Sequence, residues 1–186
     1  STRTGKGPLR NDVTFGNGYE FNALVYSITQ DRAGRIWLGS KGRGVFCLDS
    51  RNGSNNAGYR IRNYRHDPQD VYSLSHDNVY TVFEDGYGRI WVGTFNGGLN
   101  YLVEDNSGVR FINSNNELKG YPLANHKRIR HISEDSHSNI WVGTTNGLLV
   151  FDQRFKSPSE IRFRAFSYDP GDEGSLANND VHFIYS

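Results

Sequence analysis

Short apolar stretches alternate with turn-forming residues along the chain, and one arrangement of them recurs. In its clearest copy, the alternating residues 79–83 predict a first β-strand and the wholly apolar Ile90-Trp91-Val92 predicts a second. Residues 85–88 between them read Asp-Gly-Tyr-Gly, which predicts a tight hairpin turn because Asp can bond its own backbone and Gly accepts a positive φ. A further turn and two further strands are predicted at residues 96–98, 99–102 and 110–112.

The same unit occurs three times without gaps, at residues 26–40, 80–94 and 130–144. All three tryptophans of the chain stand at one position of it, as Trp37, Trp91 and Trp141. Four antiparallel strands in about 50 residues are typical of a propeller blade, and a Trp in each second strand suits the packing of one blade on the next. The sequence therefore predicts an all-β fold: a partial β-propeller of three four-stranded antiparallel blades and the first strand of a fourth.

The stretches between the units also match each other. Residues 64–74 and 166–176 share Asp-Pro and Ser-Leu pairs and lead at one offset into Val79 and Val181, so a fourth unit is expected to open at Val181. One interpretation of the lead-in segment 1–24 is that it forms an outer strand of a preceding blade. The rest divides into blades at 25–64, 79–113 and 129–166, inter-blade loops at 65–78 and 114–128, and a loop with the first strand of the fourth blade at 167–186.

An aspartate recurs in the first turn of each unit, and a glycine follows each second-strand tryptophan. Glu84 and Glu134 stand beside two of the aspartates, and paired carboxylates suggest acid–base catalysis. Recurrence in every blade places the pairs on separate turns, which favours turn capping instead. In the third unit Ser138 replaces the turn glycine, with Asn139 expected to share the strained geometry. We expect structural roles for the repeated residues Trp37, Trp91, Trp141, Asp31, Asp85, Asp135, Gly39, Gly93 and Gly143.

Composition narrows the class of protein. Hydrophobic residues make up 35% and charged residues 22% of the 186 residues, which is typical of a soluble globular chain. A net charge of +1 argues against a nucleic-acid partner, and neither a membrane-spanning stretch nor a signal peptide is expected. The single Cys47 lies in an apolar run, as a buried thiol does, and the six histidines show no metal-ligand spacing. We therefore expect no metal, no cofactor and no catalytic residue.

The repeated unit resembles the two-component regulator propeller repeat, whose pattern is an aliphatic strand, an acidic pair, Gly, Ile-Trp-Val-Gly-Thr and a Gly-Gly turn. The matching residues are Phe83-Glu84-Asp85, Gly88, residues 90–94 and residues 96–101, and the resemblance covers about residues 21 to 186. It implies a periplasmic, ligand-sensing propeller of a hybrid histidine kinase/response regulator of Bacteroides type, anchored in the inner membrane. It also implies that the ligand derives from a glycan and that kinase activity resides elsewhere in the parent protein.

Ligand contacts are expected on the loops that enter the first strands and on those that join the second and third strands, because these share one face of a propeller. Aromatic and amide side chains suit sugar rings and hydroxyls, and Lys and Arg suit sulfates or uronates. The candidates are Lys41, Arg43, His66, Tyr72, His76, Phe95, Asn96, Tyr121, Lys127, Arg128, Thr145 and Asn146; His126 lies in the same loop as Tyr121.

The expected partners are an oligosaccharide and the remaining propeller blades of the parent protein. Because an open run of blades exposes sheet edges and apolar faces, self-association of the chain is a further expectation. A protein-binding scaffold and a propeller lyase or glycosidase stay open as alternative functions.

Overall fold

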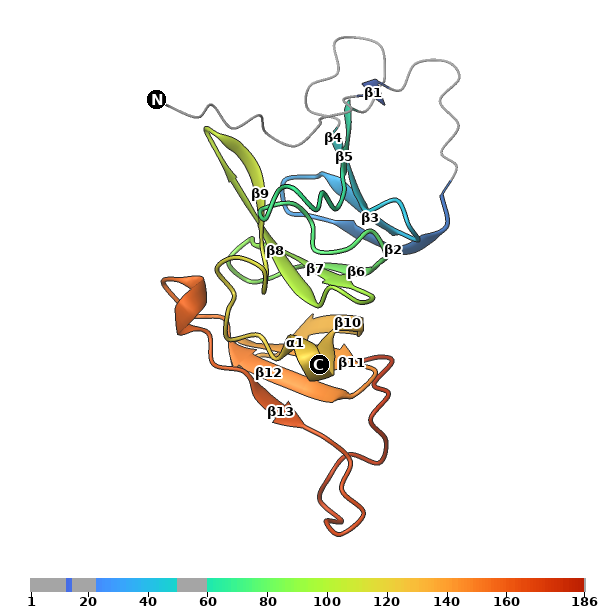
Figure 1. Cartoon of the computed structure of the whole chain (residues 1–186), viewed down its shortest axis with the longest axis vertical. Coiled ribbons are helices and arrows are strands. Elements are labelled where there is room, and N and C mark those ends of the chain that lie inside the picture. The colour runs from blue at the N-terminus through green and yellow to red at the C-terminus, as the bar shows by residue number, and fades with distance from the viewer. Residues whose placement is uncertain (1–12, 15–22, 50–59, 186) are drawn as a thin grey trace.

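The computed structural model describes residues 13–14, 23–49 and 60–185, and nearly all of its regular structure is β (Figure 1). Three antiparallel sheets follow one another along the chain, with strand orders β1-β5-β4-β3-β2, β6-β7-β8-β9 and β10-β11-β12-β13. The first sheet comprises β1 (Val13–Thr14), β2 (Val25–Gln30), β3 (Ile36–Ser40), β4 (Val45–Asp49) and β5 (Arg60–Tyr64). The second comprises β6 (Val79–Glu84), β7 (Ile90–Thr94), β8 (Leu99–Asp105) and β9 (Gly108–Ile112). The third comprises β10 (Ile129–Glu134), β11 (Asn139–Thr144), β12 (Gly147–Asp152) and β13 (Arg164–Phe166).

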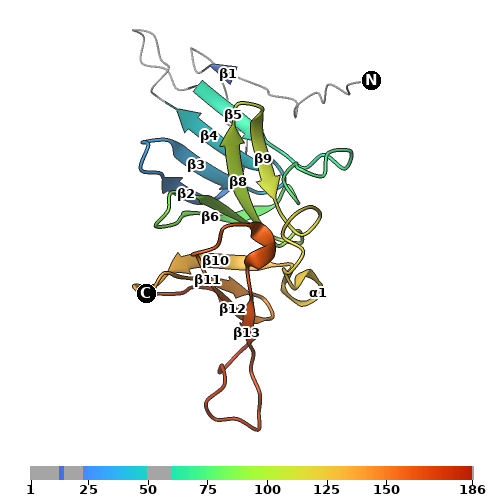
Figure 2. The same cartoon turned by 90° about the vertical axis from the view of Figure 1, so that its left-hand side faces the viewer.

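The three sheets stack in a row, with the first strands β2, β6 and β10 adjacent along one side (Figures 1 and 2). In a closed propeller this inner edge faces the central channel. Helical structure among the described residues is confined to one turn at α1 (Leu123–His126) and the 3-10 turn Pro158–Glu160. The arrangement confirms the all-β prediction of four-stranded blades. None of the helices in the described ranges is long and apolar enough to cross a bilayer.

Two ends of the row differ from the expectation. The lead-in contributes β1, which pairs antiparallel with β5 at the outer edge of the first blade rather than with a preceding blade. Residues 181–185 form no β-ladder, because no described segment lies beside them as a second strand. They still join the third blade as a following blade would, since the Val181 N–H donates to the Thr144 carbonyl at 2.9 Å.

The repeated aspartate joins its turn to the tryptophan of its blade. Asp85 accepts hydrogen bonds from the Trp91 indole Nε1 at 2.8 Å and from the Arg89 backbone N–H at 2.9 Å and side chain at 2.7 Å. Asp31 bonds Trp37 in the same way at 2.9 Å, and Asp135 accepts from the indole of the third blade at 2.8 Å. Because the carboxylate holds the turn and the indole together, a buried Trp N–H finds its acceptor within its own blade.

The tryptophans fill the space between blades. Trp91 is fully buried and packs against Phe151 and Phe155 of the third blade, with ring centroids 5.2 and 6.2 Å apart. Trp37 is 1% exposed and belongs to the cluster that the first two blades share. Trp141 is only half-buried. Burial of the tryptophan is therefore complete where a described blade follows, and partial at the third blade.

Each glycine after the second-strand tryptophan gives the next blade room. A Cβ on Gly39 would lie 2.8 Å from a methyl group of Val79, and one on Gly93 would lie 2.5 Å from a methyl group of Ile129. A Cβ on Gly143 would meet the carbonyl oxygen of Val181 at 2.8 Å. The absence of a side chain thus sets the distance between neighbouring blades.

Carboxylates also link neighbouring blades at the opposite end of the strands. Glu84 of the second blade accepts from the backbone N–H of Arg32 at 2.8 Å, and Glu134 of the third blade accepts from that of Gly86 at 2.6 Å. The first turns of the first and second blades are thereby held by the first strand of the blade that follows. In the third blade the turn residue Ser138 itself takes the left-handed conformation, with φ of 68°, where Asn139 had been expected to share it.

Candidate functional site

The candidate ligand-binding residues lie on one face of the row, here called the loop face: turns 41–44, 95–98 and 145–146 and loops 65–78, 113–128 and 167–180. Backbone hydrogen bonds join each turn to the loop that enters the next blade. Gly44 donates to the Asp77 carbonyl at 2.8 Å, Gly98 to the Lys127 carbonyl at 3.0 Å and Gly147 to the Asn179 carbonyl at 2.6 Å. The loop face is therefore a hydrogen-bonded surface built alike in each blade.

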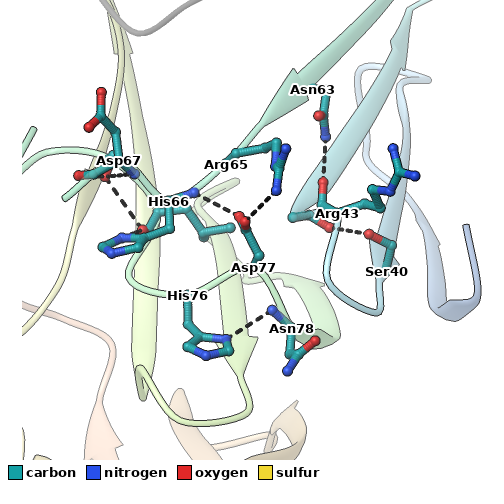
Figure 3. A network of polar contacts seen from close by, with 12 residues as sticks. Ser40, Arg43, Asn63, Arg65, His66, Asp67, His76, Asp77 and Asn78 are labelled. Carbon is teal, nitrogen blue, oxygen red and sulfur yellow. Dashed lines mark hydrogen bonds and ion pairs between the residues drawn. The ribbon is translucent and has the colours of Figure 1, made fainter.

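One polar cluster on this face surrounds Asp77 (Figure 3). The carboxylate accepts from the Arg65 guanidinium and from the His66 backbone N–H, both at 2.8 Å. Burial lowers the pKa of His76, a shift that Asp77 opposes and His66 reinforces. The His76 ring accepts from the Asn78 backbone N–H at 3.0 Å. The His66 ring Nδ1–H donates to the Leu74 carbonyl at 2.8 Å, so the rings of both histidines bond the backbone of their own loop.

The predicted residue Arg43 lies beside this cluster (Figure 3). Its carbonyl accepts a hydrogen bond from the Asn63 amide at 2.8 Å, which fixes the turn against β5. Its side chain is exposed. Arg43 is thus a predicted residue whose charged side chain is open to solvent next to the Asp77 cluster.

A second cluster lies at the inner edge of the loop face, where the first strand of every blade contains a β-bulge. The pairing register shifts at Tyr26 in β2, at Tyr80 in β6 and at Arg130 in β10, the second residue of each first strand. A bulge reorients the side chain of the extra residue relative to its strand. These three equivalent residues therefore leave the regular alternation of their sheets.

The reoriented side chains stack across blade boundaries. The rings of Tyr26 and Tyr80 stack with centroids 4.4 Å apart, and Tyr80 stacks on Phe95 at 4.7 Å. The guanidinium of Arg130 lies 5.3 Å from the Phe95 ring centroid, and that of Arg128 lies 5.2 Å from it. We call these five residues the aromatic array. It joins all three blades into one surface of ring faces and cations.

The charges around the array are arranged asymmetrically. Arg130 forms two hydrogen bonds of 3.1 Å with Asp180, and the pKa of Asp180 is lowered, with this bond as the main cause. Arg128 instead contacts the Asn96 side-chain oxygen at 3.2 Å. Burial and a hydrogen bond with Tyr26 raise the pKa of Tyr80, whereas the charges of Arg130 and Lys41 lower it. The predicted residue Lys41 therefore lies within electrostatic range of the array.

The backbone at Asn96 has an unusual, strained conformation. Asn96 is exposed and has φ of 120°, in the left-handed region that non-glycine residues rarely adopt. Its N–H donates to the Lys127 carbonyl at 2.9 Å, which holds the conformation. Such strain persists where the surrounding structure enforces it, commonly at binding sites.

Other predicted residues lie apart from both clusters. Tyr121 is 4% exposed, and its hydroxyl donates to the His126 carbonyl at 2.6 Å, so it is a core residue and not a surface contact. The reason is long-range packing, because Phe163 of the third blade covers its ring at 5.2 Å. Tyr72 is half-buried beneath Arg110, with the guanidinium carbon 5.5 Å from the ring centroid.

The remaining predicted residues stay at the surface of the loop face. Lys127 and Asn146 are exposed, and Thr145 is half-buried. The Thr145 N–H donates to the Arg128 carbonyl at 3.1 Å, which connects the third turn to the array. His126 is 6% exposed, and burial lowers its pKa.

Tyr26, Tyr80 and Arg130 were absent from the sequence-based candidates. The signal was available, because these residues occupy the first column of the repeated unit, where aromatic and basic types replace the aliphatic ones around them. The bulges that bring these three side chains together could not be predicted, because a regular alternation of apolar and polar residues contains no sign of an extra residue.

Two observations on the described residues concern metal binding and thiol reactivity. No group of three or more His, Cys, Asp or Glu side chains within the described ranges could hold a metal ion. Burial raises the pKa of the Cys47 thiol to about 12, which disfavours the reactive thiolate.

Three blades joined through a common loop face define this molecule as a segment of a β-propeller. The family model described as "Two component regulator propeller" matches residues 19–42, 73–96 and 123–146. The chain therefore carries three repeats of the two-component regulator propeller family. None of the curated proteins compared with the chain matches it.

Two solved structures are similar to the chain. The extracellular domain of a hybrid two component system, BT3049 from B. thetaiotaomicron, is 24% identical over 81% of this chain and 18% of its own length, with a TM-score of 0.54. The extracellular domain of BT4673 from the same organism is 23% identical over 89% of this chain and 20% of its own, with a TM-score of 0.37. The first likeness supports the fold. The chain spans about a fifth of the length of each of these structures.

Proposed function

We propose that this chain is part of an extracytoplasmic, periplasmic sensor propeller of a hybrid two-component system, and that it binds a glycan-derived oligosaccharide on its loop face. The aromatic array is the observation that supports the ligand class. Tyr26 is 41% exposed, and its ring continues through Tyr80 to Phe95. Stacked aromatic faces beside hydrogen-bonding side chains suit the apolar faces and hydroxyls of sugars.

The family and the fold support the sensor role. Three repeats match the two-component regulator propeller model, and the solved neighbours are described as extracellular domains of such systems. The proposal places signal output, including histidine kinase activity, in domains outside these residues. It assigns the chain no catalytic step.

Binding is tested by titrating the purified chain with a panel of neutral and acidic oligosaccharides in a calorimeter. Tyr80→Ala is expected to weaken binding roughly tenfold or more, because central aromatic anchors carry most of the affinity of a binding surface. Tyr87→Ala is the matched control, since Tyr87 is 63% exposed in a turn at the opposite end of the strands. A chain that binds no sugar, but captures a protein partner through the loop face, would identify a scaffold instead.

We also propose further propeller blades as a partner of the first blade. Leu24 and Ile28, on β2 or next to it, are 65% and 71% exposed, which is unusual for two aliphatic residues so close together. A preceding blade would cover them as β6 covers β3 of the first blade. The isolated chain is then expected to self-associate through this flank. Light scattering measures its mass, and a monomer at micromolar concentration would exclude self-association.

A further inference from the structure

Arg128 is a cation that no carboxylate of the described residues neutralises. Its guanidinium is exposed and lies over Phe95 at 5.2 Å, and its polar partner is the neutral Asn96 amide at 3.2 Å. Among the described residues, no carboxylate lies within ion-pair distance of it. Arg130 differs, because Asp180 holds it through two bonds of 3.1 Å. One arginine of the array is thus neutralised and the other is available.

The loop face adds further available cations around the array. Lys41, Arg43 and Lys127 are exposed, and in the part of the chain that the structure describes none of them forms an ion pair. Lys41 lies beside the start of β2, the strand that carries Tyr26, because its backbone N–H donates to the Leu24 carbonyl at 2.9 Å.

Several carboxylates of the same face bond groups of their own loops. Asp67 and Asp70 accept from backbone N–H groups of their own loop at 2.9 Å. Asp169 and Asp172 do the same at 2.8 and 2.9 Å. Asp77 pairs with Arg65 at 2.8 Å. The first four aspartates thus stabilise turns, and of the two arginines of the array Arg130 bonds a carboxylate, that of Asp180, whereas Arg128 bonds the Asn96 amide.

From this juxtaposition we propose that the aromatic array selects an acidic sugar, one that carries a carboxylate or a sulfate group. The oligosaccharide lies along the array from the exposed ring of Tyr26, and its acid group pairs with Arg128. A planar guanidinium held flat on a ring presents its N–H fork to an oxyanion with little loss of freedom. This inference rests on the proposed function, because it names the chemical class of the oligosaccharide.

The test uses matched pairs of sugars that differ in charge. Trigalacturonic acid is compared with its methyl ester, and a chondroitin 4-sulfate tetrasaccharide with its desulfated form, by calorimetric titration of the whole chain. The acidic or sulfated member of at least one pair is expected to bind tenfold or more tightly than its partner. The pair with the larger difference identifies carboxylate or sulfate as the recognised group.

Variants connect that preference to named residues. Arg128→Gln is expected to weaken binding of the charged sugar about tenfold, which corresponds to one charge-assisted contact, and to leave the uncharged partner unaffected. Asp180→Asn releases Arg130 and is expected to strengthen binding of the charged sugar several-fold. A gain of affinity on removing a carboxylate is not a result that misfolding produces. Arg162→Gln is the control, because Arg162 is exposed in the connection between β12 and β13, at the other end of the strands.

The outcomes separate this inference from the function on which it rests. Equal binding of both members of every pair, with Arg128→Gln unchanged, overturns the acidic-sugar inference and leaves a sensor of neutral glycans. Binding of pentaglutamate as tightly as the charged sugars overturns it in favour of an acidic peptide. Absence of binding to any sugar removes both the inference and the proposed ligand.

Discussion

Replacement of Asp85 by alanine tests whether the carboxylate that joins turn and tryptophan stabilises the blade. Asp85 has no exposed surface, and its carboxylate accepts four hydrogen bonds: from the N–H groups of Tyr87 and Arg89, the Arg89 side chain and the Trp91 indole. The substitution removes all four and leaves the fully buried indole N–H without an acceptor. Arg89 keeps its bond to the Gln153 carbonyl.

The magnitude follows from burial. A buried donor left unpaired costs about 1–3 kcal/mol, and breaking a buried charge pair costs about 3–5 kcal/mol. Because Arg89 is half-buried and retains one bond, we expect Asp85→Ala to lower the free energy of unfolding by about 3–5 kcal/mol in total. Asp135→Ala is the matched change in the third blade. Its partner is the neutral Asn139 and its Trp141 reaches solvent, so about 1–2 kcal/mol is expected there.

Urea unfolding followed by tryptophan fluorescence and circular dichroism measures both losses, with the slopes compared to detect a change in cooperativity. Asp85→Asn keeps one acceptor oxygen and the shape of the side chain, and serves if the alanine variant does not fold. Equal losses from Asp85→Ala and Asp135→Ala would refute the reasoning, because the difference rests on burial of the indole and on the charge of Arg89.

Three further predictions use the same measurement. Gly93→Ala should cost about 1–3 kcal/mol, because its Cβ would lie 2.5 Å from a methyl group of Ile129; a neutral result would show that the blades can move apart freely. Trp91→Ala should cost about 3–5 kcal/mol, the usual result of emptying a large buried site, and a variant with wild-type stability but no ligand binding would reverse this structural assignment. Although burial opposes the shift, hydrogen bonds from Asn139 and Trp141 lower the pKa of Asp135, so its contribution is present at pH 5 and is lost as the pH falls below about 4. Asp135→Asn should therefore make unfolding midpoints at pH 5 and pH 2.5 differ less than in the wild type.

The fold could be predicted because its signals are local and repeated. The aspartate, the tryptophan and the glycine after it act within one hairpin or at one joint, so three copies in the sequence specify three blades. Residues whose environment comes from a distant segment were harder to predict. Tyr121 was expected at the surface as a loop residue, yet Phe163 and Gly98 from two different blades enclose it.

The candidate site was only partly predictable from the sequence, for the same reason. Phe95 and Arg128 were predicted from their loops, but their stacking with Tyr80 depends on bulges and on the spacing between blades. Pairing of β1 with β5 depends in the same way on a contact between segments far apart in the sequence. Neither contact leaves a periodic pattern in the residues that make it.

The glycine joints have an evolutionary consequence. Gly39 receives Val79, Gly93 receives Ile129, and Gly143 receives Val181, so the joint has the same small socket and a β-branched occupant each time. In-frame duplication or loss of one whole unit would again place a glycine against a β-branched residue, as at each of these three contacts. Recombination between units can therefore lengthen or shorten a row of blades without disturbing these contacts. The bulged residues Tyr26, Tyr80 and Arg130 lie outside them and can differ from blade to blade.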